Sequence, residues 1–246
     1  MADKVLVVEG LKKKYNNNKD FTIKGISFSC EKGEVVGIVG RNGAGKSTTI
    51  KCITGLHDYT EGDIFVAGFD MRKEPIKAKY HLGYVPDVSL AFDKMTGIEY
   101  LNFIADIFGV DSESRKRRIE YLDGLFGLNE ALYRLINSYS HGMRQKVSVM
   151  ASILSEPELW ILDEPLTGLD PQTSMALKKL MQEYAKEGHT VIFSSHNLDV
   201  VEKICDRVLI ISDGNLVKDM SRSEIDSLDC SLEEYFVNNH FYGEEL

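Results

Sequence analysis

The sequence predicts an α/β protein with a mixed, mainly parallel sheet, an N-terminal antiparallel β subdomain and an inserted α-helical subdomain. Short segments with strand-like composition recur along the chain: 5–8, 21–29, 35–39, 159–162 and 190–193. Helical segments separate the last three, which is the alternation typical of parallel sheets. From residue 88 to about 157 the pattern is helical, so this segment is the predicted insertion.

Composition limits the classes of function. The chain has 246 residues, 43% hydrophobic and 27% charged, as in ordinary globular proteins. Its net charge of −9 argues against nucleic acid as a partner, because phosphate neutralisation needs clustered Lys and Arg. Its four cysteines lack metal-ligand spacing and are expected to be reduced thiols in a cytosolic protein. We find no signal peptide and no run of the ~18 apolar residues that span a membrane, so a membrane role would require a partner.

A glycine-rich loop follows the strand at 35–39. It matches the phosphate-loop pattern with Gly40, Arg41, Asn42, Gly43, Ala44, Gly45, Lys46, Ser47 and Thr48. A helix is expected at 47–56, and its N-terminus adds positive charge where the glycines let N–H groups face one anion. Lys46 is expected to reach terminal phosphates and Ser47 to offer its hydroxyl to Mg²⁺.

Two other residues near predicted strands are candidate ligand contacts. Tyr15, between the first two strands, is either an aromatic at a hairpin end or a ring that stacks on a nucleotide base. Further strands are predicted at 62–67 and 82–85. Asp87 follows the second of these, where ligands of α/β sheets gather, although a turn former or helix cap is the alternative.

Capping signals divide the helical segment. Thr96 begins a capping box, and Gly109 can end that helix. Asp111 or Ser112 starts the next helix, which Gly127 closes. A third helix is expected from an N-cap at Ser140 to a stop at Pro157, and its Met-containing apolar stripe is expected to be core.

Adjacent carboxylates, Asp163 and Glu164, follow the strand at 159–162. Because side chains alternate along a strand, we expect them to face different ways. One can hold a metal through its water shell, and the other can take a proton from an attacking water. A surface acidic pair at a turn is the alternative.

The remaining elements complete the sheet. Asp170 and Pro171 are expected to start a helix that Gly188 ends. The strand at 190–193 leads to His196, which is expected to contact phosphate at the same sheet edge, although a polar residue that starts a helix is the alternative. A closing hairpin is predicted from 207–212 and 215–218, and a short helix within 231–246.

The order of these motifs resembles the ATP-binding subunit of ABC transporters, from Val5 to about Asp219. The loop at 40–48 is similar to the family's first nucleotide motif, and 159–164 to its second. The signature motif is matched by Ser140, His141, Gly142, Met143 and Gln145. Leu169 and Asp170 resemble the dimer-contact loop, His196 the switch histidine, and Tyr15 the aromatic that stacks on adenine.

The resemblance implies a P-loop NTPase core at 1–220, with the helical subdomain at 88–157 inserted in it, and a tail at 221–246. It implies ATP and Mg²⁺ as cofactors, with Ser47, Asp163 and Asp87 at the metal and Glu164 as general base. Two subunits, expected to be identical, would pair head to tail over two ATP molecules. An integral membrane permease, encoded separately, would be the second partner and would hold the subunit at the inner face of the cell membrane.

Two residues depart from the usual family pattern. His141 stands where a glycine is usual, and Asp87 stands where glutamine is usual. Both variants are similar to exporter-type subunits, which implies ATP-driven export. The alternatives are a soluble ABC-type ATPase without a transport role and the ATPase subunit of an importer.

Overall fold

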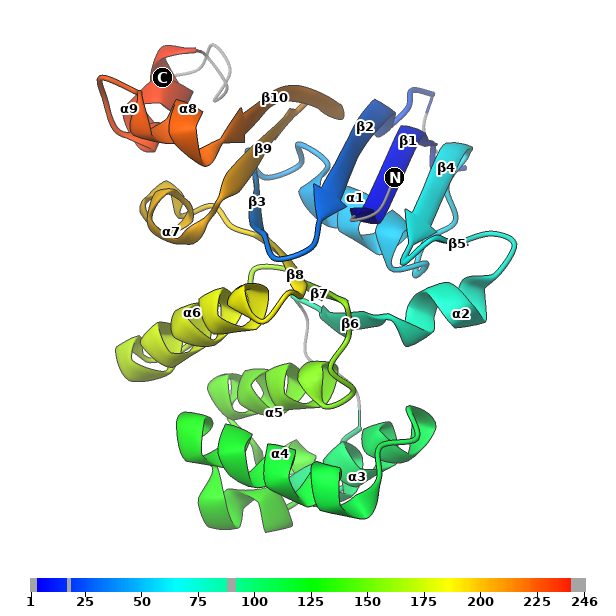
Figure 1. The fold of residues 1–246 in the computed structure, drawn as a ribbon, viewed down its shortest axis with the longest axis vertical. Coiled ribbons are helices and arrows are strands. Elements are labelled where there is room, and N and C mark those ends of the chain that lie inside the picture. Colours follow the sequence, from blue (N-terminus) through cyan, green and yellow to red (C-terminus); the bar gives the residue numbers. More distant parts are fainter. Residues whose placement is uncertain (1–3, 17–18, 88–91, 240–246) are drawn as a thin grey trace.

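The computed structural model describes residues 4–16, 19–87 and 92–239. Its fold is α/β, with two sheets and flanking helices, as predicted (Figure 1). The first residues of the predicted helical segment, 88–91, and the end of the predicted tail, 240–246, lie outside the described residues.

The larger sheet has the strand order β10-β9-β3-β8-β7-β6. Its strands are β3 (Val35–Val39), β6 (Leu82–Val85), β7 (Leu159–Leu162), β8 (Thr190–Ser194), β9 (Arg207–Ser212) and β10 (Asn215–Ser221). Only the β9–β10 pair is antiparallel among these. Every residue of β3, β7 and β8 is buried, because both faces of the sheet are covered, and this explains their unbroken apolar runs.

The smaller sheet is antiparallel, with the order β2-β1-β4-β5. Its strands are β1 (Lys4–Lys13), β2 (Ile23–Glu31), β4 (Glu61–Val66) and β5 (Phe69–Asp70). The prediction of 5–8 for the first strand was too short. The pairing of β1 with β2 shifts register between Val8 and Leu11, around Gly10 at φ 57°, and this irregularity breaks the side-chain alternation that marks a strand.

The predicted helical segment contains α3 (Gly97–Ile107), α4 (Ser112–Phe126) and α5 (His141–Ile153). The capping box at Thr96 is confirmed, as are the N-cap at Asp111 and the left-handed C-cap at Gly127. α5 ends at Ile153, before Pro157, the residue that was predicted to stop it. The helix cannot continue into Pro157, since the residue before a proline avoids helical backbone, and Glu156 adopts φ 51°.

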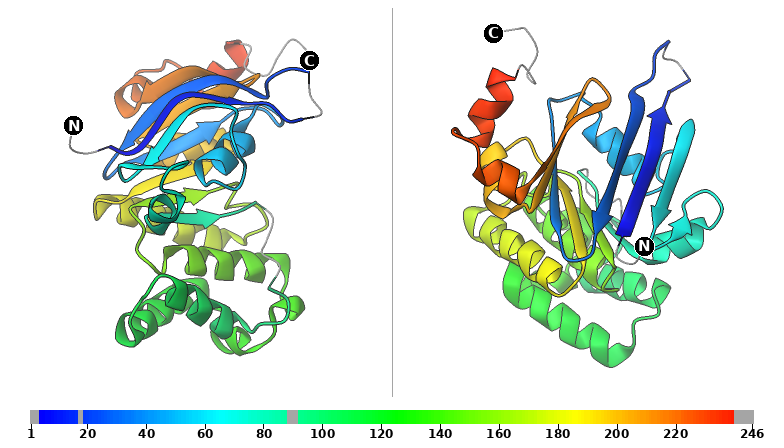
Figure 2. Two further views of the ribbon diagram at one scale, coloured as in Figure 1. Left: turned by 90° about the vertical axis from the view of Figure 1, so that its right-hand side faces the viewer. Right: turned by 45° about the horizontal axis from the view of Figure 1, so that its top comes forward.

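The other helices surround the sheets. They are α1 (Lys46–Ile53), α2 (Pro75–Tyr80), α6 (Pro171–Lys186), α7 (Leu198–Ile204), α8 (Arg222–Asp226) and α9 (Leu232–Asn238). Short 3-10 helices at Asn129–Tyr133 and Ile136–Ser138 precede α5. The structure confirms Asp170 as the N-cap of α6, whereas α2, α7 and α8 were not predicted. In both views of Figure 2 the helices at 97–153 lie at one end of the molecule, away from the antiparallel sheet.

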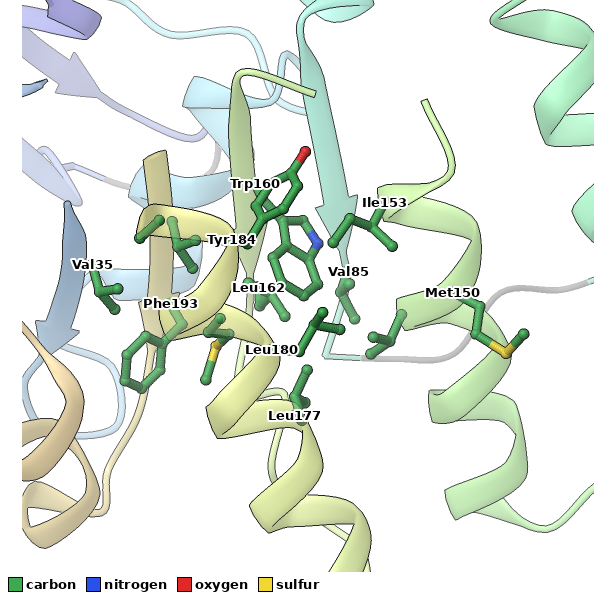
Figure 3. Packing of buried hydrophobic residues seen from close by; sticks show 14 of the residues in the cluster. Val35, Val85, Met150, Ile153, Trp160, Leu162, Leu177, Leu180, Tyr184 and Phe193 are labelled. Carbon is green, nitrogen blue, oxygen red and sulfur yellow. The ribbon is translucent and has the colours of Figure 1, made fainter. Parts of the chain in front are cut away.

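The core divides into two clusters on the two faces of the larger sheet. Trp160 and Leu162 of β7 belong to one cluster, and Leu159 and Ile161 to the other. In Figure 3, Trp160 and Leu162 lie between α6 and α5. At Gly83 of β6 a Cβ atom would stand 2.1 Å from the carbonyl oxygen of Ser152, so only glycine permits this approach of α5 to the sheet edge.

Candidate active site

The phosphate loop connects β3 to α1, and its glycines are required by the backbone. Gly40 has φ 154°, and a Cβ there would stand 2.2 Å from the carbonyl oxygen of Ile211. Gly45 is the N-cap of α1 with φ 115°. Because the cap has no side chain, the first N–H groups of the helix remain available to an anion. Arg41, Asn42 and Gly43 are exposed at the loop's surface.

The Lys46 side chain lies along this loop. Its Nζ donates to the carbonyl oxygens of Gly40 at 2.7 Å and Arg41 at 3.2 Å, and the residue is 6% exposed. Burial lowers the pKa of Lys46, while the carboxylates of Glu164 and Asp163 act in the opposite direction. The lysine is therefore held on the loop, with an acidic pair close enough to influence its charge.

Asp163, which follows β7, lies beside the start of α1. It is fully buried. Its Oδ1 accepts from the hydroxyls of Ser47 at 3.1 Å and Ser194 at 2.7 Å, whereas Oδ2 is buried with no hydrogen-bond partner. A buried carboxylate oxygen without a partner is costly unless another group satisfies it. Together with the Ser47 hydroxyl, this set of hard oxygen donors suits Mg²⁺.

Glu164 faces a different way from Asp163, but strand alternation is not the reason. β7 ends at Leu162, and Glu164 adopts a left-handed backbone with φ 48°. Its Oε2 lies 2.9 Å from Nδ1 of His196, and its backbone N–H donates to the Ser194 hydroxyl at 2.9 Å. A left-handed non-glycine residue is strained, and such strain gathers at functional sites.

Ser194 has no predicted role, although its hydroxyl connects the Asp163 carboxylate to the backbone N–H of Glu164. One feature could have predicted a role for Ser194: it is a hydroxyl residue at the last position of the buried strand β8. In the sheet, β8 is the neighbour of β7, the strand that ends at Leu162. A polar residue at the carboxyl end of a central strand points to a ligand site.

A cavity of about 440 Å³ opens between the phosphate loop and the loop after β8. Gly40, Arg41 and Asn42 line one side, Ser195 and His196 the other, and Leu198 and Phe236 complete the wall. His196 is exposed, with 67% of its side chain accessible, whereas Glu164 is 16% accessible. The cavity therefore places His196 opposite the glycine-rich loop that is expected to bind phosphate.

The start of α5 forms a second group with the loop after Glu164. Ser140 caps α5 by accepting from the Met143 N–H at 3.3 Å, so the N-cap prediction is confirmed. Buried Gln145 donates to the carbonyl oxygen of Pro165 at 3.4 Å. A Cβ at Gly168 would stand 2.5 Å from the exposed His141 ring.

Other contacts extend this second group. Lys146 pairs with Asp170 at 3.6 Å, Gly142 lies beside the Gly168 carbonyl, and Leu169 is half-buried. The predicted signature motif and the predicted dimer-contact loop are thus neighbours within one chain. None of the contacts described between them involves Lys46 or Ser47.

Tyr15 lies at the opposite end of α1 from Lys46. Its hydroxyl is 2.9 Å from Nδ1 of His57, whose backbone N–H bonds to Lys51 in the last turn of the helix. Lys13 Nζ lies 4.7 Å from the centroid of the Tyr15 ring. Burial, and then the charges of Lys51 and Lys13, lower the pKa of His57. The phenol therefore stands apart from Lys46 and Ser47, the residues expected to contact phosphate and metal.

Asp87 is exposed and does not share the Ser47–Asp163 hydrogen bond. The negative charge of Asp87 influences the nearby Tyr84. Burial raises the pKa of Tyr84, and the charges of Asp163 and then Asp87 raise that pKa further. Within the described residues, no group of three or more His, Cys, Asp or Glu side chains could hold a metal. A metal here would instead depend on Ser47, Asp163 and ligands from outside the chain.

Comparisons with known proteins agree with this geometry. A family model described as ABC transporter matches residues 23–167. The chain is 39% identical over 214 residues to the linearmycin resistance ATP-binding protein LnrL of Bacillus subtilis, covering 87% of this chain and 68% of that protein. It is 36% identical over 197 residues to the ABC transporter ATP-binding protein NatA of the same organism, covering 79% and 80%.

Solved structures give the same result. An ATP-binding subunit of an ABC transporter matches with a TM-score of 0.89 and 32% identity, over 95% of this chain and 98% of that chain. A dimeric ATP-binding cassette in a post-hydrolysis state, bound to ADP and Pi, matches with a TM-score of 0.78 and 22% identity, over 88% and 98%. The second match supports the fold alone.

Proposed function

The chain belongs to the ABC transporter family of ATP-binding ATPase subunits, and on that premise we propose that it drives export through a separately encoded membrane permease. The observation that carries the ATP-hydrolysing part of this proposal is the pair formed by Glu164 and His196, 2.9 Å apart beside the phosphate loop. Such a pair can activate water next to a bound terminal phosphate.

ATP would bind with its phosphates on the loop at 40–48. The N–H groups at the start of α1 and the Lys46 ammonium supply positive charge there. Lys46 would exchange its two carbonyl acceptors for phosphate oxygens, which are stronger acceptors because they are charged. Tyr15 would leave His57 and stack on the adenine, at the far end of α1 from the phosphates.

Mg²⁺ would be held by the Ser47 hydroxyl and Asp163, whose partnerless Oδ2 supports this assignment. Asp87, which is exposed, would act through water. The metal, when bound, neutralises phosphate charge. Ser194 keeps Asp163 oriented toward Ser47 by donating to the same carboxylate oxygen that Ser47 contacts.

Glu164 would accept the proton of the attacking water, and His196 would hold that water and the γ-phosphate in line. The low exposure of the Glu164 side chain favours this division of roles, since a general base works best out of bulk solvent. The left-handed backbone at Glu164 directs its carboxylate toward His196 while Asp163 remains buried.

A second copy of the chain would complete each site. One phosphate loop leaves the γ-phosphate in water, and the start of α5 offers another helix N-terminus. Ser140 and Gly142 of the second copy would supply donors to that phosphate. The contact of His141 with Gly168 would join the signature motif to the dimer-contact loop at Leu169 and Asp170, so both would reach the interface together.

A permease segment would dock in an apolar cavity of about 260 Å³ between α1, β6, α3 and α5. Its lining includes Leu56, Tyr84, Ile104 and Phe108. Leu56 in its wall is exposed, and so are Phe103 and Ile107 of α3, the helix that contributes Ile104 to the cavity. Such patches mark interaction sites. Every helix that the structure describes is too short or too polar to span a membrane.

The relative named for linearmycin resistance supports export as the direction, because resistance is served by removing a toxic compound from the cell. Cargo contacts would lie in the permease, and the ATPase subunit would stand at the inner face of the cell membrane.

The test is Glu164→Gln, which keeps the shape of the side chain but removes the base. We expect hydrolysis to fall about 10²–10⁴-fold while ATP still binds, so that the variant accumulates as an ATP-bound dimer in light scattering. Wild-type turnover in this variant, or a monomer at saturating ATP, would contradict the proposal.

A further inference from the structure

The C-terminal helix α9 reaches the wall of the cavity that holds His196. Phe236 of α9 lines this cavity together with Leu198, Ser195 and the phosphate loop. The residue is 1% exposed. The first turn of α7 and the tail therefore form one side of the space in which the proposed chemistry takes place.

The core sheet supports His196 on one side: its Nδ1 lies 2.9 Å from Oε2 of Glu164, and the N–H of the preceding Ser195 donates to a carbonyl oxygen of β3 at 3.2 Å. His196 lies on the short connection between β8 and α7, and 67% of its side chain is accessible. Around it, Ser195 accepts from the Asn197 N–H at 3.0 Å, and Asn197 caps α7 by accepting from the Val200 N–H at 3.1 Å. The His196 backbone is therefore held between β3 on one side and α7, a helix of seven residues, on the other, so a shift of α7 would move it.

The tail fixes α7 from the other side. The Leu232 N–H, at the start of α9, donates to Oε2 of Glu202 at 2.9 Å. Arg222 of α8 donates to the carbonyl oxygens of Glu202 and Cys205 at the end of α7. In Figure 1, α7, α8 and α9 lie together beyond β9, and α7 packs against α9.

Apolar contacts complete this support. Leu198 and Val201 of α7 share one buried cluster with Leu232 and Phe236 of α9. A seven-residue helix is too short to be stable alone, so its place depends on such tertiary packing. Removing the Phe236 ring would leave a void behind Leu198, into which α7 can shift.

We propose that Phe236 is a positioning residue, which holds α7 and thereby places His196 opposite Glu164 at the phosphate loop. The tail would then set the rate of hydrolysis without touching the nucleotide. This inference rests on the proposed function of His196.

The first experiment compares Phe236→Ala with Phe126→Ala. Phe126 is a matched control: it is 3% exposed and belongs to the same cluster, but it ends α4. We expect Phe236→Ala to lower kcat by about tenfold or more, since small misplacements of catalytic groups cost up to about 10²-fold, with ATP affinity unchanged. Phe126→Ala should lower Tm similarly and leave kcat within about twofold of wild type. Phe236→Leu should restore most of the activity.

A milder variant, Glu202→Ala, removes the acceptor of the Leu232 N–H without opening the core. This variant replaces Phe236→Ala in the test if Phe236→Ala does not fold. We expect it to lower kcat by a smaller factor, about threefold.

A second readout does not depend on turnover. The ring resonance of His196 in a proton NMR spectrum, identified by its loss in His196→Ala, should move in the Phe236 and Glu202 variants and stay in place in Phe126→Ala. If kcat and the resonance both match wild type in Phe236→Ala and Glu202→Ala, or if Phe126→Ala reproduces their effects, the inference is wrong. Failure of the proposed function gives a different result, namely normal turnover in Glu164→Gln.

Discussion

The hydroxyl of Ser194 donates a hydrogen bond of 2.7 Å to Oδ1 of Asp163 at the carboxyl ends of two adjacent strands. The same oxygen of Ser194 accepts from the Glu164 N–H at 2.9 Å. One buried hydroxyl therefore holds both residues that follow β7, the first through its side chain and the second through its backbone.

Replacing Ser194 with alanine should weaken the fold and the catalysis together. We expect the free energy of unfolding to fall by about 1–3 kcal/mol, because the Glu164 N–H loses its acceptor and the buried Oδ1 of Asp163 loses one of its two donors. Turnover should fall more than ATP affinity, since the base at Glu164 is displaced while the phosphate loop is kept. Urea unfolding and steady-state ATPase assays measure the two effects. Ser138→Ala, at an exposed serine, should change neither.

Replacing Lys46 with alanine should remove nucleotide affinity. A charged hydrogen bond contributes roughly 1.5–3 kcal/mol, so the Kd for ATP should rise about 10–100-fold. Equilibrium binding of a fluorescent ATP analogue gives this value. Lys51→Ala, in the last turn of the same helix, is the control and should bind as wild type does. Equal affinities for all three proteins would count against the phosphate-loop assignment.

The N-cap of α6 should make stability depend on acid pH. The hydroxyl of Thr173, and then its backbone N–H, donate to Asp170 and lower the pKa of that carboxyl to about 2. Because this value lies below that of the unfolded chain, near 3.8, the stabilisation is complete above about pH 4 and is lost as pH falls toward 2.

Asp170→Ala should therefore lower Tm at pH 7 by about 2–4 °C and by less at pH 3. Thermal unfolding followed by circular dichroism at both pH values checks this. Asp170→Asn keeps a capping oxygen that does not titrate, so its Tm should lie nearer to wild type at pH 7. A pH-independent difference for Asp170→Ala would show that the charge of Asp170 is unimportant.

A charge in the apolar cavity between α1 and α3 should release the subunit from its permease. Leu56 lines this cavity and is 58% exposed. In Leu56→Asp we expect ATPase activity of the isolated chain to persist and recovery with the membrane fraction to fall, because an aspartate cannot be buried there cheaply. Met175→Asp, at an exposed position of α6, is the matched control. Membrane recovery of Leu56→Asp equal to that of Met175→Asp would place the permease contact elsewhere.

Several features of this protein could be predicted from the sequence because they depend on local constraints. The strands at 35–39, 82–85 and 159–162 were predicted with the bounds that the structure has, since unbroken apolar runs of that length fit a covered sheet. Thr96, Asp111 and Asp170 were predicted as helix starts because a cap bonds only to its own helix. The glycine spacing of the phosphate loop is local in the same way.

Tertiary structure decided what depends on distant partners. No local pattern predicts the left-handed backbone of Glu164. The same is true of the link through Ser194 and of the contact of His141 with Gly168, which bring together segments that are distant in the sequence. Phe236 of the tail and His196, which follows a strand of the core sheet, line the same cavity although they are distant in the sequence. Sequence alone determined which chemical groups the protein has and on which elements they lie. Packing of the sheet and helices determined which of those groups meet, because hydrogen bonds and steric contacts act only over a few ångströms.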